Sequence, residues 1–396
     1  MSETPFNIAV SDSKFALLKK KLSLTTFPDE LEDSGWEYGV PLANVRHLAE
    51  KWQNSFDWRT HEAQLNSELP QFTRDIPVSG YGALNIHYVH KKSAVAGAIP
   101  LLFVHGWPGS FLEVRKLAPL LTQGTADFPA FHVVALSLPG TGFSQGPRTK
   151  GFDIDQYAEV GNKLMLALGY PEYVTQGGDL GFPITYRIAK LYGGKHAKAL
   201  HTNMPIGAPP EAGTAPTLTP KEQERLAKNG EFFARGTGYL QQQKTQPQTL
   251  GYSLADSPVG LLAWIYEKLV NWSDEYPWTD DEVLTWVSIY WFSRAGPTAS
   301  LRVYFEAENR DIDAIFAISQ PTPSIPLGIS HFPNDSIVFP KSWTRAIGNV
   351  VFDGEHESGG HFAAYERPTE LVDDLRKMFG KAGPAFGVVK GQDGYA

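Results

Sequence analysis

The sequence predicts an α/β protein with a mostly parallel sheet, a helical insertion and an N-terminal extension. Short apolar runs alternate with amphipathic helical segments from residue 99 to about residue 205. Strand signals then stop over a helical, aromatic stretch that reaches about residue 310, and they return before the C-terminus. Such alternation indicates a parallel sheet that is covered on both faces. The predicted parts are an N-terminal extension wrapped on the core (1–95), the first part of the core (96–205), a helical cap (206–320) and the second part of the core (321–396).

The composition describes an ordinary globular protein and excludes several classes of function. The chain has 396 residues, of which 42% are hydrophobic and 20% are charged, so it can bury a large core. A net charge of −8 without a basic stripe argues against a nucleic-acid partner. The lack of cysteine excludes disulfides, thiol catalysis and cysteine-ligated zinc.

No segment has the pattern of a signal peptide or a membrane span. The N-terminus lacks a basic region followed by a long apolar stretch. The most apolar run, residues 94–104, is far shorter than the roughly 20 residues that cross a bilayer, and Pro100 interrupts it. We therefore expect a soluble, cytoplasmic protein without a membrane anchor.

Each part of the predicted fold rests on its own periodicity. In the extension, helical periodicity over 43–56 precedes strand-like alternation at 72–78 and 84–92. In the core, we expect strands at 99–104, 131–138, 172–176, 325–333 and 345–353, and helices at 111–121, 157–169, 182–194 and 368–380. In the cap, we expect helices at 218–234, 258–272, 280–292 and 299–308. A helical block inserted into such a sheet is the plan of an α/β-hydrolase fold with a cap.

Two stretches have the spacing of a nucleophile elbow, a strained turn that directly follows a strand and directly precedes a helix. The first stretch, residues 142–146 (GFSQG), is the literal G-x-S-x-G pattern of a serine esterase, with Ser144 at its centre. The strand before it ends several residues too early, and Gly146, Pro147 and Gly151 oppose a helix after it. We therefore favour a scaffold loop over a nucleophile for Ser144.

The second stretch, residues 177–181 (GGDLG), has the same spacing with Asp179 in the middle. A strand-like run precedes it, and Pro183 falls in the first turn of the following helix, where proline is tolerated. The N-terminus of that helix also favours an ionised carboxylate. A simple Asp N-cap is the structural alternative. We favour Asp179 as the nucleophile.

The other members of a catalytic triad follow in the chain order acid, then histidine. His361 comes after two glycines behind the last predicted strand, whereas His356 lies between two glutamates as an ordinary loop residue. Asp335 falls in the loop after the preceding strand, where a turn-forming Asn-Asp pair is the alternative explanation. Asp353 and Glu355 are rivals for the role of the acid.

An oxyanion hole in this fold uses the backbone N–H after the nucleophile and a second one from the loop after an early strand. Here these are the N–H groups of Leu180 and of Trp107, which lies in the turn 105–108 (HGWP). The sequence leaves the isomer of the Trp107–Pro108 bond open.

The ordered set of motifs resembles the epoxide hydrolases of the microsomal type, in their soluble fungal form. The motifs are HGWPGS (105–110), PGTGFS (139–144), GGDLG (177–181), SLRVYFE (300–306), FPND (332–335) and SGGHFAAYERP (358–368), with WEYGVPL (36–42) and FDW (56–58) in the extension. The resemblance covers nearly the whole chain. It departs at Thr141, where relatives often have an aromatic residue, and in the anchor helix of membrane-bound relatives, which this sequence does not show.

The resemblance implies a role for each candidate residue. Asp179 forms a covalent ester with an epoxide, His361 and Asp335 activate the water that cleaves the ester to a vicinal diol, and the cap residues Tyr239 and Tyr304 hold the epoxide oxygen. The implied partner is a small apolar epoxide, as in detoxification or aromatic hydrocarbon catabolism. No metal or organic cofactor is implied. The oligomeric state stays open, with a homodimer as one alternative.

Three other functions stay open. A haloalkane dehalogenase shares the Asp–His–acid chemistry but releases a halide and has no use for two phenolic donors. A serine esterase would require Ser144 as its nucleophile. A non-catalytic receptor of hydrolase-like fold would bind an apolar ligand under the cap without turnover. Assays of halide release, diol formation and ligand binding separate these functions.

Overall fold

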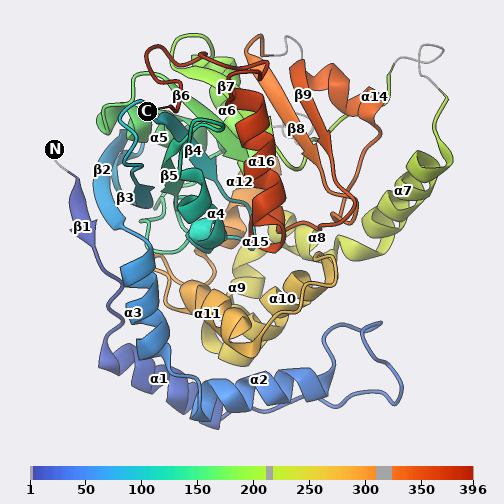
Figure 1. The fold of residues 1–396 in the computed structure, drawn as a ribbon. Helices are drawn as coiled ribbons and strands as arrows, with labels where there is room; N and C mark the ends of the chain where they lie inside the picture. Colours follow the sequence, from blue (N-terminus) through green and yellow to red (C-terminus); the bar gives the residue numbers. More distant parts are fainter. Residues whose placement is uncertain (1–2, 211–216, 309–322, 396) are drawn as a thin grey trace.

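The computed structural model describes residues 3–210, 217–308 and 323–395. The described residues form one sheet, whose strands are β1 (Thr4–Phe6), β2 (Gln71–Val78), β3 (Gly82–Lys91), β4 (Ile99–Val104), β5 (Phe131–Leu136), β6 (Tyr173–Gly177), β7 (Ala197–Thr202), β8 (Pro326–His331) and β9 (Asn349–Glu355). Their order is β1-β2-β3-β5-β4-β6-β7-β8-β9 (Figure 1). The strands from β5 to β9 in this order pair in parallel, whereas β1, β2 and β3 pair antiparallel at one edge. The predicted α/β-hydrolase fold is confirmed.

Helices cover both faces of the sheet because its central strands are apolar on both sides. Every residue of β4 is buried, which requires cover on each face. Helix α4 (Val114–Leu121) packs beside α16 (Pro368–Phe379), and α5 (Ile154–Ala167) packs beside α6 (Gly181–Tyr192) on the opposite face (Figure 1). Each of these helices follows a parallel strand in the chain. The loops at the carboxyl ends of the parallel strands therefore meet at one edge of the sheet, where ligands bind in open α/β sheets.

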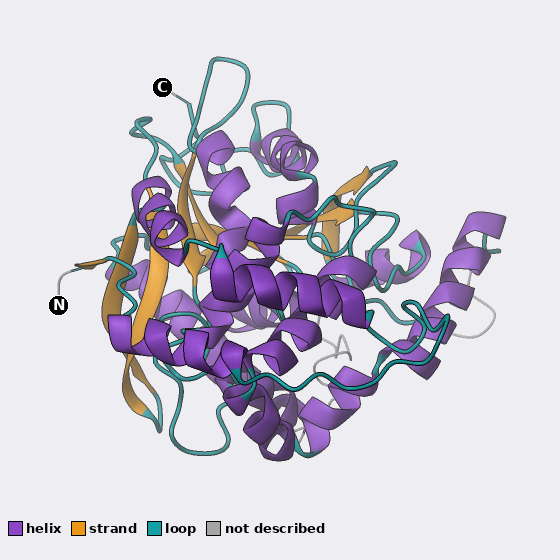
Figure 2. Ribbon diagram, turned by 90° about the horizontal axis from the view of Figure 1, so that it is seen from below, coloured by secondary structure: helices purple, strands orange, loops and turns teal. Residues whose placement is uncertain are grey.

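The helical cap is inserted between β7 and β8. Figure 2, which is seen from below, shows cap helices in front of the sheet. They are α7 (Pro220–Glu231), α8 (Gly238–Thr245), α9 (Pro247–Asp256), α10 (Pro258–Asn271), α11 (Asp280–Trp291) and α12 (Arg302–Glu308). Capping boxes begin α7 at Thr219 and α11 at Thr279, and Ser257 caps α10 before a proline. Of the predicted cap, residues 211–216 and 309–320 lie outside the described residues.

Other short elements complete the fold. A 3₁₀ turn (Phe111–Glu113) precedes α4, a π-helical turn (Phe232–Gly236) follows α7, and a second 3₁₀ turn (Ala299–Leu301) precedes α12. Between β8 and α16 lie α14 (Lys341–Thr344), a 3₁₀ turn (Arg345–Ile347) and α15 (Ala363–Glu366). The sequence prediction missed β1, β7, α8, α9 and α3 (Trp58–Glu68).

The extension contributes helices below the cap and three strands, β1, β2 and β3, to the sheet. Helices α1 (Asp12–Ser23) and α2 (Leu42–Asn54) pack against α10, and α3 leads into β2 and β3 at the sheet edge (Figure 1). The buried side chains of Leu18, Trp52 and Trp58 belong to the same hydrophobic cluster as those of the sheet and the cap. Across the described ranges, no helix combines the length and the apolar character that crossing a bilayer requires.

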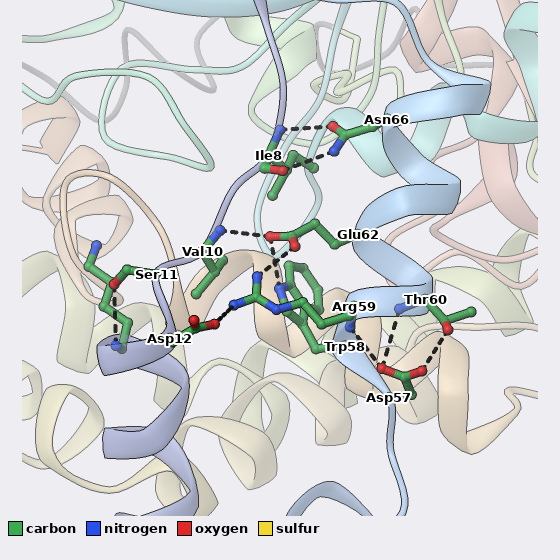
Figure 3. A network of polar contacts seen from close by, with 11 residues as sticks. Ile8, Val10, Ser11, Asp12, Asp57, Trp58, Arg59, Thr60, Glu62 and Asn66 are labelled. Atoms are coloured by element: carbon green, nitrogen blue, oxygen red, sulfur yellow. Dashed lines mark hydrogen bonds and ion pairs between the residues drawn. The ribbon is translucent and has the colours of Figure 1, made fainter.

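Buried polar contacts join the first residues of the extension to α3 (Figure 3). The Glu62 carboxylate accepts the backbone N–H of Val10 at 2.7 Å, the indole N–H of Trp58 at 3.2 Å and the guanidinium of Arg59 at 2.7 Å. Asn66 makes two further hydrogen bonds to the backbone of the same segment. Because buried backbone groups must be paired, these contacts fix the path of the chain before α1.

Candidate active site

Asp179 stands in a strained turn between β6 and α6. Its φ is 49°, a left-handed conformation that non-glycine residues seldom adopt. A Cβ at Gly181 would lie 2.0 Å from the carbonyl oxygen of Val104, and one at Gly177 would lie 2.6 Å from the carbonyl oxygen of Gly181. The turn therefore requires glycine on both sides of the aspartate, which is the elbow geometry that the spacing predicts.

Ser144 lies in a long loop after β5, and α5 begins only ten residues later. Its side chain is fully buried. The hydroxyl accepts the backbone N–H of His87 at 2.9 Å and donates to the carbonyl oxygen of Ser137 at 2.7 Å. These bonds tie β3 to the loop, so the scaffold interpretation accounts for the position of Ser144.

The structure brings the other two predicted triad residues next to Asp179. Nδ1 of His361 lies 2.8 Å from Oδ1 of Asp335, and Nε2 of His361 lies 3.6 Å from Oδ2 of Asp179. Asp335 comes from the loop after β8 and His361 from the loop after β9, so the three side chains meet at the carboxyl edge of the sheet.

The rival candidates have other partners. Nε2 of His356 pairs with Asp374 of α16 at 2.7 Å. Asp353 pairs with His331 and with a guanidinium of the 3₁₀ turn at Arg345–Ile347, at 2.9 and 2.7 Å. Glu355 pairs with Lys341 at 3.1 Å. The ion pairs of these three residues therefore lie near α14 and α16 and do not include Asp179.

A buried carboxylate holds the histidine loop against the cap. Glu366 accepts backbone N–H groups from Asp274 at 2.8 Å, Gly360 at 3.2 Å and Phe362 at 2.8 Å. The backbone N–H of His361 donates to the carbonyl oxygen of Trp272 in the cap at 2.8 Å. These bonds fix the position of the imidazole relative to the cap.

The two N–H groups that are predicted to form the oxyanion hole bind the Asp179 carboxylate. The backbone N–H of Trp107 donates to Oδ1 of Asp179 at 2.7 Å, and the N–H of Leu180 also bonds this carboxylate. The Trp107–Pro108 bond is cis. A Cβ at Gly106 would lie 2.2 Å from Oδ1 of Asp179, so only glycine leaves room for the carboxylate here.

The two predicted tyrosines lie together in the cap, Tyr239 on α8 and Tyr304 on α12. Their ring centroids are 6.2 Å apart, and the Trp107 indole stacks on Tyr239 at 5.3 Å and meets Tyr304 edge-on at 6.1 Å. Burial, and next the charge of Asp179, raise the pKa of both phenols, so both are protonated at neutral pH. The Tyr304 hydroxyl is buried and has no hydrogen-bond partner among the described residues, which suits a group that binds a ligand oxygen.

Charges within the site set the protonation states of Asp179 and His361. Burial raises the pKa of the Asp179 carboxyl, and the His361 ring and the N–H groups of Trp107 and Leu180 oppose this shift. Burial alone would lower the pKa of His361, but Asp335 and then Asp179 raise it to about 9. The charges of Asp335 and Asp179 therefore favour the protonated form of His361.

Sequence reasoning missed Glu113, which lies in the 3₁₀ turn before α4. Burial raises the pKa of its carboxyl to about 8, and His361 opposes the shift. A Cβ at Gly109 would lie 1.8 Å from Oε1 of Glu113, so the HGWPGS turn leaves room for this side chain. No pattern in the sequence marks Glu113, because its electrostatic interactions with His361 and Asp179 follow only from the structure.

Sequence reasoning also missed Lys268 of α10, whose ammonium lies over the ring of Tyr239. Here a signal was present. Trp264, Lys268 and Trp272 follow one another at intervals of four residues, which places them on one face of the helix.

Two family models match the chain. The model described as "Epoxide hydrolase N terminus" matches residues 3–114, and the model described as "alpha/beta hydrolase fold" matches residues 99–254. Together they span the extension, the first part of the core and the beginning of the cap.

Similar proteins extend the match over nearly the whole chain. Epoxide hydrolase 1 of Sus scrofa is 33% identical over 411 residues, which cover 95% of this chain and 88% of that protein. The structure of Aspergillus niger epoxide hydrolase matches with a TM-score of 0.84 and 35% identity, covering 95% of each chain. The juvenile hormone epoxide hydrolase of the silkworm Bombyx mori matches with a TM-score of 0.86 and 28% identity, covering 94% of this chain and 93% of that one.

Proposed function

Since the chain belongs to the epoxide hydrolases of the microsomal type and is itself an epoxide hydrolase, we propose that it converts a small apolar epoxide to a vicinal diol through a covalent ester of Asp179. One observation carries this proposal. The Asp179 carboxylate stands in the strained turn with Oδ1 bonded to the Trp107 N–H and Oδ2 facing His361 at 3.6 Å. A carboxylate in this position can attack carbon without the help of a base.

In the first step, Oδ2 of Asp179 attacks a ring carbon of the epoxide. The new C–O bond forms as the ring C–O bond breaks, and the released oxygen would be a strongly basic alkoxide. Tyr239 or Tyr304 gives this oxygen a proton, and acid catalysis from a fixed position is worth roughly 10²–10⁴-fold. Because Oδ1 stays on the N–H groups of Trp107 and Leu180, it becomes the carbonyl oxygen of the ester.

Ester formation changes the charge around His361. The negative charge of Asp179, which helps to raise the pKa of the imidazolium, disappears when the carboxylate becomes an ester. The ring then gives up its proton more readily, which restores the phenol that donated in the first step. The same loss of charge that ends the first step thereby prepares His361 to act as a base.

In the second step, neutral His361 takes a proton from water as the water oxygen attacks the ester carbonyl carbon. Asp335 stabilises the imidazolium that forms. The oxyanion at Oδ1 is held by the N–H groups of Trp107 and Leu180, and a donor of this kind is worth about 3–4 kcal/mol. Collapse of this intermediate breaks the ester bond, and the leaving alkoxide takes the remaining proton of the attacking water, which yields the diol and the Asp179 carboxylate.

The surroundings of the site favour an apolar substrate. Aromatic rings lie around the Trp107 indole, at centroid distances from 5.3 to 6.5 Å; they belong to Tyr239, Trp264, Trp272 and Tyr304. Apolar and aromatic side chains with a few convergent polar groups are typical of small-molecule sites. We propose small aryl or alkyl epoxides as the substrate class, with a role in the breakdown of aromatic hydrocarbons.

Isotope labelling tests the ester mechanism. Excess enzyme is mixed with styrene oxide in ¹⁸O water for a single turnover, and the diol is analysed by mass spectrometry. The first diol should carry an oxygen from Asp179 and no label from the solvent. Labelled diol in the first turnover would show direct attack by water and overturn the proposal. Ser144→Ala is the control, because it should form the same unlabelled diol, whereas Asp179→Asn should form none.

A further inference from the structure

Lys268 is a buried cation beside one of the proposed proton donors. The residue is 5% exposed. Its Nζ lies 4.9 Å from the ring centroid of Tyr239, 5.7 Å from that of Trp272 and 5.8 Å from that of Trp264. The neighbouring Glu267 carboxylate forms an ion pair with it. The ammonium therefore sits among three aromatic faces with a carboxylate on one side.

A gain in the stability of the fold does not by itself explain why the Lys268 ammonium is buried. Moving an ammonium out of water is costly, and a buried ion pair is often no more stable than a well-packed apolar pair of similar size. Attraction to the negative faces of the rings offsets part of that cost, and it amounts to about 2 kcal/mol when the cation is desolvated. An apolar residue would fill the same space without the penalty.

The ion pair is also asymmetric in its exposure. The Glu267 side chain is 32% exposed, whereas that of Lys268 is 6% exposed. Solvent therefore screens the carboxylate more than the ammonium. The extension lies close to Glu267, because a Cβ at Gly39 would lie 3.9 Å from its Oε2, and Trp36 packs edge-on against Tyr266 at 5.9 Å. Of the two charges, the ammonium is the one that lies over the Tyr239 ring.

We propose that Lys268 is a positioning residue for the ring-opening step, which acts through Tyr239 by stabilising the negative charge that the phenol acquires as its proton moves to the epoxide oxygen. This inference rests on the proposed role of Tyr239 as a donor. Two carboxylates, Asp179 and Asp335, oppose ionisation of the Tyr239 phenol. A cation over the face of its ring counters them without touching the substrate.

The experiment measures ring opening separately from ester hydrolysis. In a His361→Gln background the ester should accumulate, so the rate of adduct formation with styrene oxide can be followed by intact mass. Lys268→Met, which keeps the length of the side chain without its charge, should slow adduct formation by about tenfold. Lys268→Arg, which keeps the charge, should retain most of the rate.

The double variant distinguishes action through Tyr239 from a structural role. In a Tyr239→Phe background, Lys268→Met should cause little further loss, because the phenol on which the cation acts is gone. An equal loss in both backgrounds would show that the lysine only supports packing and would overturn the inference. If Lys268→Met does not fold, Lys268→Gln and Lys268→Arg give the same comparison of neutral and charged side chains.

Two further outcomes distinguish a failure of this inference from a failure of the proposed function. If Tyr239→Phe leaves adduct formation unchanged, the role of Tyr239 as a donor is wrong. If Tyr239→Phe slows it but Lys268→Met does not, only the role of Lys268 is wrong. Lys116→Met is the matched control, because Lys116 is also partly buried with its Nζ 3.8 Å from the ring centroid of Tyr365. It should lower thermal stability and leave adduct formation unchanged.

Discussion

The imidazole of His361 shows how single residues in this site depend on their neighbours' charges. The ring lies between Asp335 and Asp179, whose charges favour its protonated form. Its pKa in the folded protein, about 9, lies above its ordinary value of 6.5. Protonation of the ring therefore stabilises the fold.

The direction of this shift predicts how stability depends on pH. A group whose pKa is raised on folding contributes stability that is fully present below its unfolded pKa of 6.5 and is lost as the pH rises through about 9. The Tm of the wild type, compared with that of His361→Gln, should therefore fall as the pH rises from about 7 to about 9.5. Differential scanning fluorimetry across this range measures the difference. A constant difference would show that His361 is not protonated in the resting fold.

The sequence predicts a residue of the candidate site only where that residue lies in a recognisable sequence motif. The elements on either side distinguish Asp179 from Ser144, and the structure brings Asp179 together with Asp335 and His361. The choice of Asp335 over Asp353 cannot come from local sequence, because both are aspartates at or just after the end of a predicted strand. The spacing of Trp264, Lys268 and Trp272 predicts a shared helix face, but the contact of Lys268 with Tyr239 joins two cap helices and follows only from the structure.

At the scale of elements, the loop after β4 and the turn after β6 approach each other so closely that a side chain at the contact would clash. Gly106 leaves room for the Asp179 carboxylate, and a Cβ there would lie 2.2 Å from its Oδ1. Gly106→Ala should therefore push the carboxylate off the Trp107 N–H and slow ester formation by at least about tenfold. Adduct formation in the His361→Gln background measures this rate.

A glycine in open surroundings provides the control. A Cβ at Gly230 in α7 would meet no atom within 4 Å, so alanine there should leave the rate unchanged and stabilise the helix by up to about 1 kcal/mol. If Gly106→Ala forms adduct at the wild-type rate, the carboxylate is not confined as the structure indicates.

The elements themselves are predictable where periodicity is strong and the residues suit the element. Strand β4 (IPLLFV) and helix α10 (PVGLLAWIYEKLVN) are predicted close to their observed bounds. Strand β7 (AKALHT) is missed because alanine, lysine and histidine have little strand preference. Its place between β6 and β8, where Leu200 and His201 are buried, makes it a strand. That information lies in the sheet and not in the segment.

At the scale of the whole molecule, the extension, the sheet and the cap share one core. Trp52 of α2 and Trp58 of α3 are buried in the same cluster as β4 and α10. Ion pairs also cross from the extension to the cap, such as Lys21 with Asp256 at 2.5 Å, but exposed pairs of this kind contribute little. The apolar contacts therefore carry the attachment, whereas the hydrogen bonds of Glu62 fix the path of the extension itself.

This arrangement predicts that removal of the Glu62 carboxylate lowers the free energy of unfolding of the whole protein. Glu62→Ala leaves two buried donors, the N–H of Val10 and the indole N–H of Trp58, without their acceptor. Each loss costs about 1–3 kcal/mol, so the Tm should fall by several degrees. Glu68→Ala is the matched control from the same helix, because its ion pair with Arg115 is partly exposed to solvent and should contribute at most about 1 kcal/mol.

The shared core further predicts how the Glu62→Ala variant unfolds. Because Trp52 and Trp58 pack in the same cluster as the sheet, tryptophan fluorescence and far-UV circular dichroism should change at the same, lowered temperature. An earlier change in fluorescence than in circular dichroism would show that the extension detaches first and is not part of a common core. Coincident transitions at a lower Tm, with Glu68→Ala unchanged, would show that the chain path fixed by Glu62 supports the core that the extension shares with the sheet and the cap.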